Sequence, residues 1–196
     1  MRFSTLGVAL FAVGCSSPEP PSVSAPKFDP DAMVAAAIKE FDKNSNGTIE
    51  GDELNACPAL KASLALFDKN NDKKISADEL KARFAGYAAS GVGTTSANIH
   101  VLLDGQPLVG ATVTLTPEAC MGGAVKSATG TTTGDGTVLD FTIDGKTLPG
   151  LQIGLYRVSV AKSDLPDKLA KQLLGCEIFD SGRDGGGQIE FKLSSK

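Results

Sequence analysis

The sequence contains two related twelve-residue stretches, DKNSNGTIEGDE at residues 42–53 and DKNNDKKISADE at residues 68–79. Both have an oxygen-bearing side chain at positions 1, 3 and 5, isoleucine at position 8 and glutamate at position 12. Phe41 and Phe67 precede the two stretches, and Leu54 and Leu80 follow them. Because the match extends into the apolar flanks, the sequence indicates a duplicated structural unit.

Oxygen donors at alternate positions of such a loop suit a hard divalent cation. In this pattern the residue at position 7 offers its backbone carbonyl, position 9 binds directly or through water, and the final glutamate offers both carboxylate oxygens. Applied to this chain, the pattern predicts these ligands: Asp42, Asn44, Asn46, Thr48, Glu50 and Glu53 in the first loop, and Asp68, Asn70, Asp72, Lys74, Ser76 and Glu79 in the second.

The two loops differ at position 6, where the backbone must turn with a positive φ. Gly47 adopts this conformation freely, whereas Lys73 in the second loop has a Cβ and is expected to lose about 1–2 kcal/mol. We therefore expect the second loop to be strained, bent differently or weaker in binding. We expect both loops to bind, with dissociation constants of about 10⁻⁴–10⁻³ M.

The flanking residues predict helices on both sides of each loop. Asp29-Pro30 has the pattern of a helix start, and apolar residues at helical spacing follow it up to Phe41. Pro58 divides the segment between the loops into two short helices. Ser76 and Glu79 form a capping-box pattern at the start of the last helix.

Residues 28–87 resemble the EF-hand family, in which helix–loop–helix units bind Ca²⁺. The resemblance implies a pair of such units, with Ca²⁺ as the cofactor and the twelve residues named above as its ligands. It also implies that Ile49 and Ile75 pair the two loops back to back through a short β contact.

The N-terminus has the pattern of a targeting segment. Arg2 is followed by a mostly apolar stretch that ends at Ala12-Val13-Gly14-Cys15. Residues 1–14 resemble a bacterial lipoprotein signal, which implies acylation of Cys15 and anchoring of the protein in the bacterial cell envelope, on the periplasmic or cell-surface side. An ordinary secretory signal, or a start site with an accidental cysteine, is the alternative. Residues 15–27 are rich in proline and serine and are expected to form a tether.

The pattern changes after Tyr87. Small residues at 88–96 are expected to form a linker, and from residue 97 to 196 the apolar residues alternate, which favours an antiparallel β-sandwich of five or more strands. The expected strands carry Ile99, Val101 and Leu103; Ala111, Val113 and Leu115; Leu139, Phe141 and Ile143; Tyr156, Val158 and Val160; and Ile189, Phe191 and Leu193. Residues 165–174 have leucines at helical spacing.

Three segments of this half, 104–117, 129–143 and 154–166, resemble the carboxypeptidase regulatory-like domain, which has a transthyretin-like fold. The resemblance implies a rigid spacer or a module that contacts a protein or a glycan, without catalytic residues of its own. The predicted fold class is thus multidomain α plus β, an EF-hand pair followed by an Ig-like or transthyretin-like sandwich.

Cysteine and histidine usage gives no catalytic pattern. Apart from Cys15, the chain has three cysteines, and we favour a disulfide between Cys120 and Cys176, which leaves Cys57 free. A zinc site formed by these cysteines and His100 is the alternative. His100 is the single histidine and is expected on a strand face that points to solvent. No motif of a hydrolase or a phosphate-binding enzyme is present.

The formal net charge of −4 argues against a nucleic-acid partner. The sequence therefore predicts a lipid-anchored, calcium-binding protein that is not an enzyme. A second hypothesis is that the β-sandwich binds an envelope protein or a glycan and that the EF-hand pair is a structural cap. A third hypothesis is a catalytic or metal-dependent role for the cysteines and His100.

Overall fold

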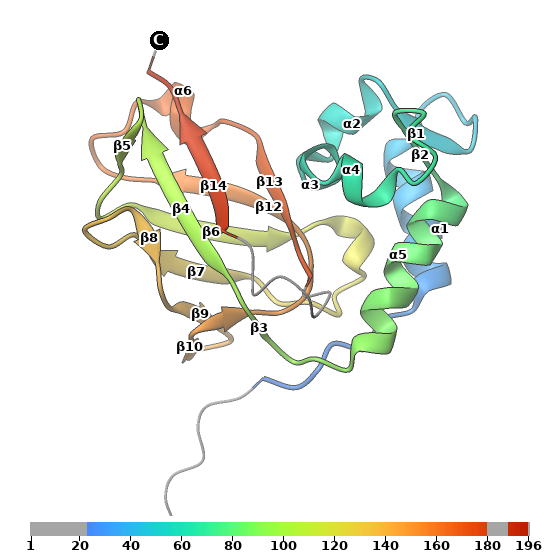
Figure 1. Ribbon diagram of the computed structural model, residues 1–196, viewed down its shortest axis with the longest axis horizontal. Coiled ribbons are helices and arrows are strands. Elements are labelled where there is room, and N and C mark those ends of the chain that lie inside the picture. Colours follow the sequence, from blue (N-terminus) through green and yellow to red (C-terminus); the bar gives the residue numbers. More distant parts are fainter. Residues whose placement is uncertain (1–22, 180–187, 196) are drawn as a thin grey trace, which may run out of the picture.

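The computed structural model describes residues 23–179 and 188–195. Figure 1 shows two parts side by side, which we call the helical half, residues 30–90, and the β half, residues 95–195. The predicted signal segment and Cys15 lie outside the described residues, and the expected tether is described only from Val23 onward. Among the described residues, no helix has the length and apolar character that crossing a membrane requires.

The helical half follows the predicted order of incoming and outgoing helices around two loops. Asp29 caps the first helix by accepting a hydrogen bond from the Ala32 amide at 3.1 Å, and the predicted capping box between Ser76 and Glu79 is present at the start of the last. The segment between the loops contains three short helices, because a further break occurs at Ser63. The helices are α1 (Pro30–Phe41), α2 (Glu53–Ala56), α3 (Pro58–Ala62), α4 (Leu64–Phe67) and α5 (Ala77–Ser90).

The two loops contact each other through a short antiparallel β pair, formed by β1 (Thr48–Glu50) and β2 (Lys74–Ser76). Ile49 lies opposite Ile75, as predicted, and both side chains are fully buried. The phenylalanines before the loops and the leucines after them are also buried. The duplication in the sequence therefore corresponds to a shared apolar core.

The β half consists mainly of two sheets. The strands of the β half are β3 (Thr95–Ser96), β4 (Asn98–Leu103), β5 (Gln106–Pro107), β6 (Thr112–Pro117), β7 (Ala128–Thr131), β8 (Thr137–Val138), β9 (Phe141–Ile143), β10 (Lys146–Leu148), β11 (Gly150–Leu151), β12 (Gly154–Ala161), β13 (Leu174–Ile178) and β14 (Gln188–Leu193). The six-stranded sheet has the order β10-β9-β7-β6-β12-β13 and is antiparallel throughout. The second sheet has the order β14-β4-β5, with β8 also paired to β4.

This arrangement fits a β-sandwich, with one departure from the antiparallel expectation. Strands β14 and β4 pair in parallel, with Ile189 opposite Ile99. Their alternate residues, among them Val101 and Phe191, are buried together with those of the six-stranded sheet. Alternation fixes which residues face the core but not the direction of neighbouring strands, which is why the sequence missed the parallel pair.

Several expected boundaries differ from the structure. Residues 88–90, expected in the linker, continue α5, and the helix ends at Gly91 in the left-handed conformation. Thr95–Ser96 forms β3, which pairs with β11. Leu139, expected in a strand, lies before β9 with 58% of its surface exposed. Residues 165–174 contain a single turn, α6 (Asp167–Ala170), and a short 3₁₀ turn, η1 (Ala119–Met121), follows β6.

The helical half packs against the outer face of the six-stranded sheet at its β13 edge (Figure 1). Alternate residues of β13 and the position after it, Gly175, Glu177 and Phe179, contact α3 and α5. A Cβ on Gly175 would lie 2.2 Å from the Ala59 backbone nitrogen, so the backbone of α3 lies directly on this strand. The two halves therefore form one packed structure in which the loops are held away from the β half (Figure 1).

Candidate metal centre

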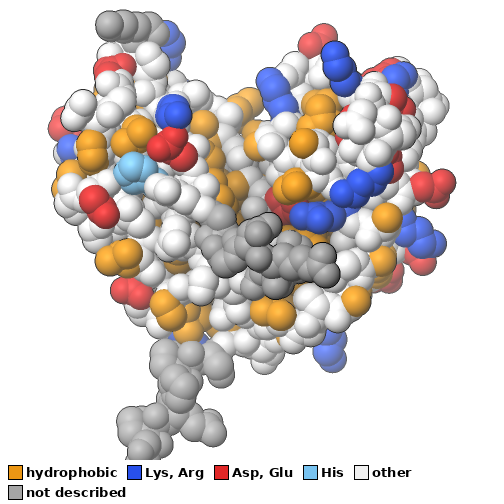
Figure 2. Space-filling view, in the orientation of Figure 1, with side chains coloured by type: hydrophobic (Ala, Val, Ile, Leu, Met, Phe, Trp, Pro, Cys, Tyr) orange, Lys and Arg blue, Asp and Glu red, His pale blue; other side chains and the backbone are white. Residues whose placement is uncertain are grey.

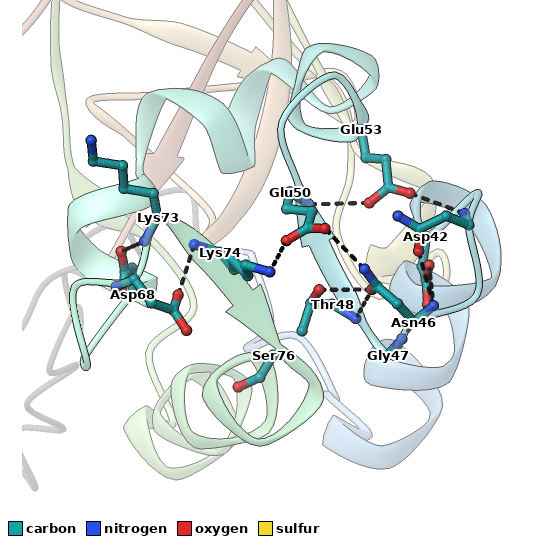
Figure 3. Close-up of polar contacts among 12 residues, drawn as sticks. Asp42, Asn46, Gly47, Thr48, Glu50, Glu53, Asp68, Lys73, Lys74 and Ser76 are labelled. Atoms are coloured by element: carbon teal, nitrogen blue, oxygen red, sulfur yellow. Dashed lines mark hydrogen bonds and ion pairs between the residues drawn. The ribbon is translucent and has the colours of Figure 1, made fainter.

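The two loops share the same backbone turns at positions 4 and 6. Positions 4 and 6 have positive φ in each, 59° and 84° for Ser45 and Gly47, and 60° and 66° for Asn71 and Lys73. Lys73 therefore adopts the left-handed conformation that Gly47 adopts in the first loop. The second loop is thus strained, as expected, and is not bent differently at this position. The Lys73 side chain points away from Asp68 (Figure 3).

The side chains at positions 1, 3 and 5 hold the loop backbone in the same way in both loops. The aspartate at position 1, Asp42 or Asp68, accepts hydrogen bonds from the amides of positions 5 and 6 at 3.1 and 2.8 Å in each loop. Asn44 and Asn70, at position 3, each accept from the position 5 amide at 3.0 Å. Asn46 and Asp72, at position 5, each accept from the position 7 amide at 2.9 Å.

The glutamate at position 12 closes each loop from the outgoing helix. Glu53 accepts from the amides of Lys43 and Asn44 with one oxygen and from that of Glu50 with the other, at 2.8–3.1 Å. Glu79 accepts from the Lys69 amide and from the amide and hydroxyl of Ser76, at 2.7–2.9 Å. Burial of Glu79 works against its ionisation, but these hydrogen bonds outweigh burial and lower its pKa.

Glu50, the predicted ligand at position 9 of the first loop, lies between its own loop and the second loop (Figure 3). Its carboxylate forms an ion pair with Lys74 of the second loop and accepts a hydrogen bond from the Asn46 side chain at 2.9 Å. The hydrogen bond with Lys74 is the main reason why the pKa of Glu50 is lowered. The ion pair thus gives Glu50 a role in joining the loops.

The donor set of each loop suits a hard cation in its chemistry, because positions 1, 3, 5 and 12 carry carboxylates or amides with oxygen donors. Within the described part of the chain, no group of three or more histidine, cysteine, aspartate or glutamate side chains is placed to hold a metal ion. The predicted ligands also include oxygens of other groups, because Asn44, Asn46 and Asn70 are amides and position 7 would offer a carbonyl. Coordination by the predicted ligands remains a prediction.

The predicted disulfide is wrong in this structure. Cys120 and Cys176 are both free and buried, as is Cys57. Cys120 lies in η1, whereas Cys176 lies on the core face of β13 opposite Tyr156. Burial raises the pKa of Cys120 and of Cys176, each to about 12, so neither thiol is ionised near neutral pH.

His100 is less exposed than expected, because its side chain is only 18% accessible. Its Nε2 lies 2.7 Å from the Asp135 carbonyl oxygen and its Nδ1 lies 3.5 Å from a carboxylate oxygen of Glu190. The turn at 133–137 therefore covers a side chain that strand alternation assigned to solvent. No cysteine is among these contacts.

Sequence reasoning missed a set of charged residues between the two halves, Arg83, Glu118, Arg157 and Glu177. Arg83 and Glu177 form an ion pair across 94 positions of sequence. The periodicity of apolar residues does not predict such a pair. The one available signal is that Gly175 and Phe179 flank Glu177 on the same face of β13 and the position after it, where an exposed face would carry mostly polar residues.

Comparison with known proteins supports the pattern in the helical half. The EF-hand family model matches residues 33–58 and 60–85. No curated protein matches the chain. One solved structure with similarity, described as the Bacillus anthracis TIE protein, has 20% sequence identity and a TM-score of 0.36. The match covers 52% of this chain but only 16% of that protein. The two matched segments, together with the duplicated loop geometry, support an EF-hand pair at residues 33–85.

Proposed function

We propose that this protein binds Ca²⁺ at both loops and is not an enzyme. The observation that carries the proposal is the near-identical hydrogen-bond frame of the two loops, in which Asp42, Glu53 and their counterparts Asp68 and Glu79 bind equivalent amides. Ca²⁺ supplies the positive charge that balances these carboxylates. These hydrogen bonds hold the backbone of each loop in the turn that brings its oxygen donors to the same side of the chain, and Ca²⁺ would draw the carboxylates together.

The first test is a calorimetric Ca²⁺ titration of the purified protein, for which we expect two sites with dissociation constants of about 10⁻⁴–10⁻³ M. Glu53→Gln should weaken one site by at least about tenfold. Glu40→Gln is the matched control, because Glu40 is exposed on α1 outside both loops. Absence of binding up to several millimolar Ca²⁺, or equal effects of the two variants, would overturn the proposal.

We also propose that the protein is anchored to the bacterial envelope through a lipid on Cys15. The support is the sequence of residues 1–15 and the proline-rich segment after it. Cys15→Ser should release the protein from the membrane fraction and abolish incorporation of labelled fatty acid. If the variant stays in the membrane fraction and still incorporates the fatty acid, the proposed anchor is contradicted.

A second candidate function places the activity in the β half, with the EF-hand pair as a cap. It is supported by a cavity of about 590 Å³ between the halves. Residues of α3, β13 and β14 line this cavity, including Lys61, Leu174, Glu190 and Phe191. Figure 2 shows a notch between the two halves. If the intact protein binds envelope glycans or proteins equally well in chelator and in Ca²⁺, this second candidate is favoured.

A further inference from the structure

The outgoing helix of the second loop is tied to the β half by a buried ion pair. Arg83 on α5 donates two hydrogen bonds to Glu177 on β13, at 2.6 and 2.9 Å. The side chains are 17% and 2% accessible, and the Tyr87 hydroxyl also donates to Glu177. The Arg83 guanidinium lies 4.6 Å from the centre of the Phe179 ring, which packs against Tyr87.

These contacts are aligned with the proposed calcium ligand of the same helix. Glu79, Arg83 and Tyr87 occupy every fourth position of α5, so they lie along one side of the helix. Glu79 closes the loop at one end, and Arg83 and Tyr87 are fixed to Glu177 at the other. A rotation or shift of α5 that moves Glu79 therefore also breaks or strains the bidentate ion pair.

The outgoing helix of the first loop is tied to the β half as well. Arg157 on β12 donates to the Ala56 carbonyl oxygen at the end of α2, at 3.2 Å, and to Glu118 at 3.3 Å. Ala56 is three residues after Glu53, the position 12 ligand of that loop. This contact is more exposed, with 47% of the Arg157 side chain accessible.

We propose that the β half is a built-in partner of the EF-hand pair, and that Glu177 and Arg157 are positioning residues for Ca²⁺ binding although both lie far outside the loops. The inference rests on the proposed calcium function and extends it. EF-hand pairs that act as sensors respond to Ca²⁺ by moving helices apart. Here both outgoing helices are fixed to one sheet, so the pair stays in one arrangement and α5 has no free face to offer an external target at this contact.

The sign of the coupling follows from the geometry. The docked arrangement is the one in which Glu53 and Glu79 already bind their loop backbones. Without its contact to the β half, an outgoing helix can adopt more positions. Only a fraction of these positions keep the glutamate at position 12 beside its loop, so the affinity for Ca²⁺ falls. By linkage, Ca²⁺ must stabilise the contact between the halves by the same factor.

The test compares Ca²⁺ titrations of the purified protein in a Glu53→Gln background, where the second loop is the remaining strong site. Adding Glu177→Gln should weaken that site by at least about fivefold. Asp164→Asn is the control, because Asp164 pairs with Lys162 within the β half and its side chain is 70% accessible, and it should leave the affinity within about twofold. The rise in melting temperature that Ca²⁺ produces should also be smaller in the Glu177→Gln variant than in the control variant.

The outcomes separate this inference from the proposed function. If the wild-type protein binds no Ca²⁺, the proposed function fails first. If it binds and the affinity of Glu177→Gln equals that of Asp164→Asn, only the positioning role is overturned. If circular dichroism shows that Glu177→Gln is unfolded, the test is made at the first loop instead. There the Ca²⁺ affinity of Arg157→Gln is measured in a Glu79→Gln background. A weaker site there supports the inference, and an unchanged site overturns it.

Discussion

At the scale of single residues, Lys73 shows how far a loop sequence can depart from its pattern without changing shape. Its φ of 66° places a residue with a Cβ in the left-handed region, yet its amide still donates to Asp68 at 2.8 Å, as Gly47 does to Asp42. The hydrogen bonds of the loop therefore outweigh the local backbone cost.

Replacement of Lys73 by glycine should strengthen the second site. The change removes a positive charge near the cation, which favours binding. It also removes a backbone strain of about 1–2 kcal/mol, which affects the dissociation constant only if the strain increases when the ion binds, because the strain is already present without the ion. Isothermal titration should show a lower dissociation constant than in the wild-type protein. Lys69→Gln separates the two causes, because it removes a loop charge at a position without positive φ. If it produces the same gain, the strain has no effect on binding.

Glu118 is the residue whose ionisation is least compatible with its surroundings. Its side chain is 3% accessible, and its Oε1 has no hydrogen-bond partner among the described residues. Burial raises its pKa, and Arg157 offsets this only in part. A carboxyl whose pKa is raised by folding is protonated more readily in the folded state, so stability falls as pH rises from the unfolded pKa through the folded pKa.

Glu118→Gln should therefore raise the melting temperature at pH 7.5 relative to the wild-type protein, and the difference should shrink toward pH 4. A gain of 1 kcal/mol corresponds to about 2–4 °C for a chain of this size. Glu190→Gln should behave in the opposite way, because the hydrogen bond with Lys192 lowers the pKa of Glu190. Thermal unfolding in chelator measures both, and an equal gain at both pH values would contradict the role assigned to Glu118.

At the scale of elements, the contact between α3 and β13 depends on the absence of a side chain. Leu174, Cys176 and Ile178 face the core of the β half, whereas Gly175 faces α3, whose backbone lies on it. A helix backbone can approach a strand this closely only where the strand has no Cβ.

Gly175→Ala should destabilise the protein by about 1–3 kcal/mol, because the nearest atoms are backbone atoms of Pro58 and Ala59, which cannot turn aside. Urea unfolding measures the loss. Gly134→Ala is the control, since a Cβ there meets nothing within 4 Å and the residue has no positive φ. If the two variants are equally stable, the close approach of α3 does not contribute to stability.

Elements were predictable from the sequence where local chemistry decides them. The caps of α1 and α5 follow from neighbouring residues, and the structure has them. The Ile49–Ile75 pair is implied by the resemblance of the duplicated loops to EF-hands, and the structure has it too. The parallel pairing of β14 with β4 and the free cysteines depend on how distant segments meet. Alternation and residue counts carry no information on such contacts, so these features required the structure.

At the scale of the whole molecule, the expected organisation of two domains separated by a linker gives way to two halves in contact. The linker residues 88–90 continue α5, which carries Tyr87 into an aromatic group with Phe28, Phe84 and Phe179. The buried Arg83–Glu177 pair lies beside this group. Separation of the halves would expose these aromatic side chains to water, which disfavours it.

The two halves should therefore unfold together, and Ca²⁺ should stabilise both. At a Ca²⁺ concentration one hundred times the dissociation constant, one site adds about 2.7 kcal/mol, which corresponds to a rise of roughly 5–10 °C. Circular dichroism at 222 nm reports the helices, and hydrogen exchange in β12 and β13 reports the β half. Both should show greater stability in Ca²⁺ than in chelator. If Ca²⁺ shifts the helical signal while exchange in these strands stays unchanged, the halves are independent and the β half does not respond to the loops.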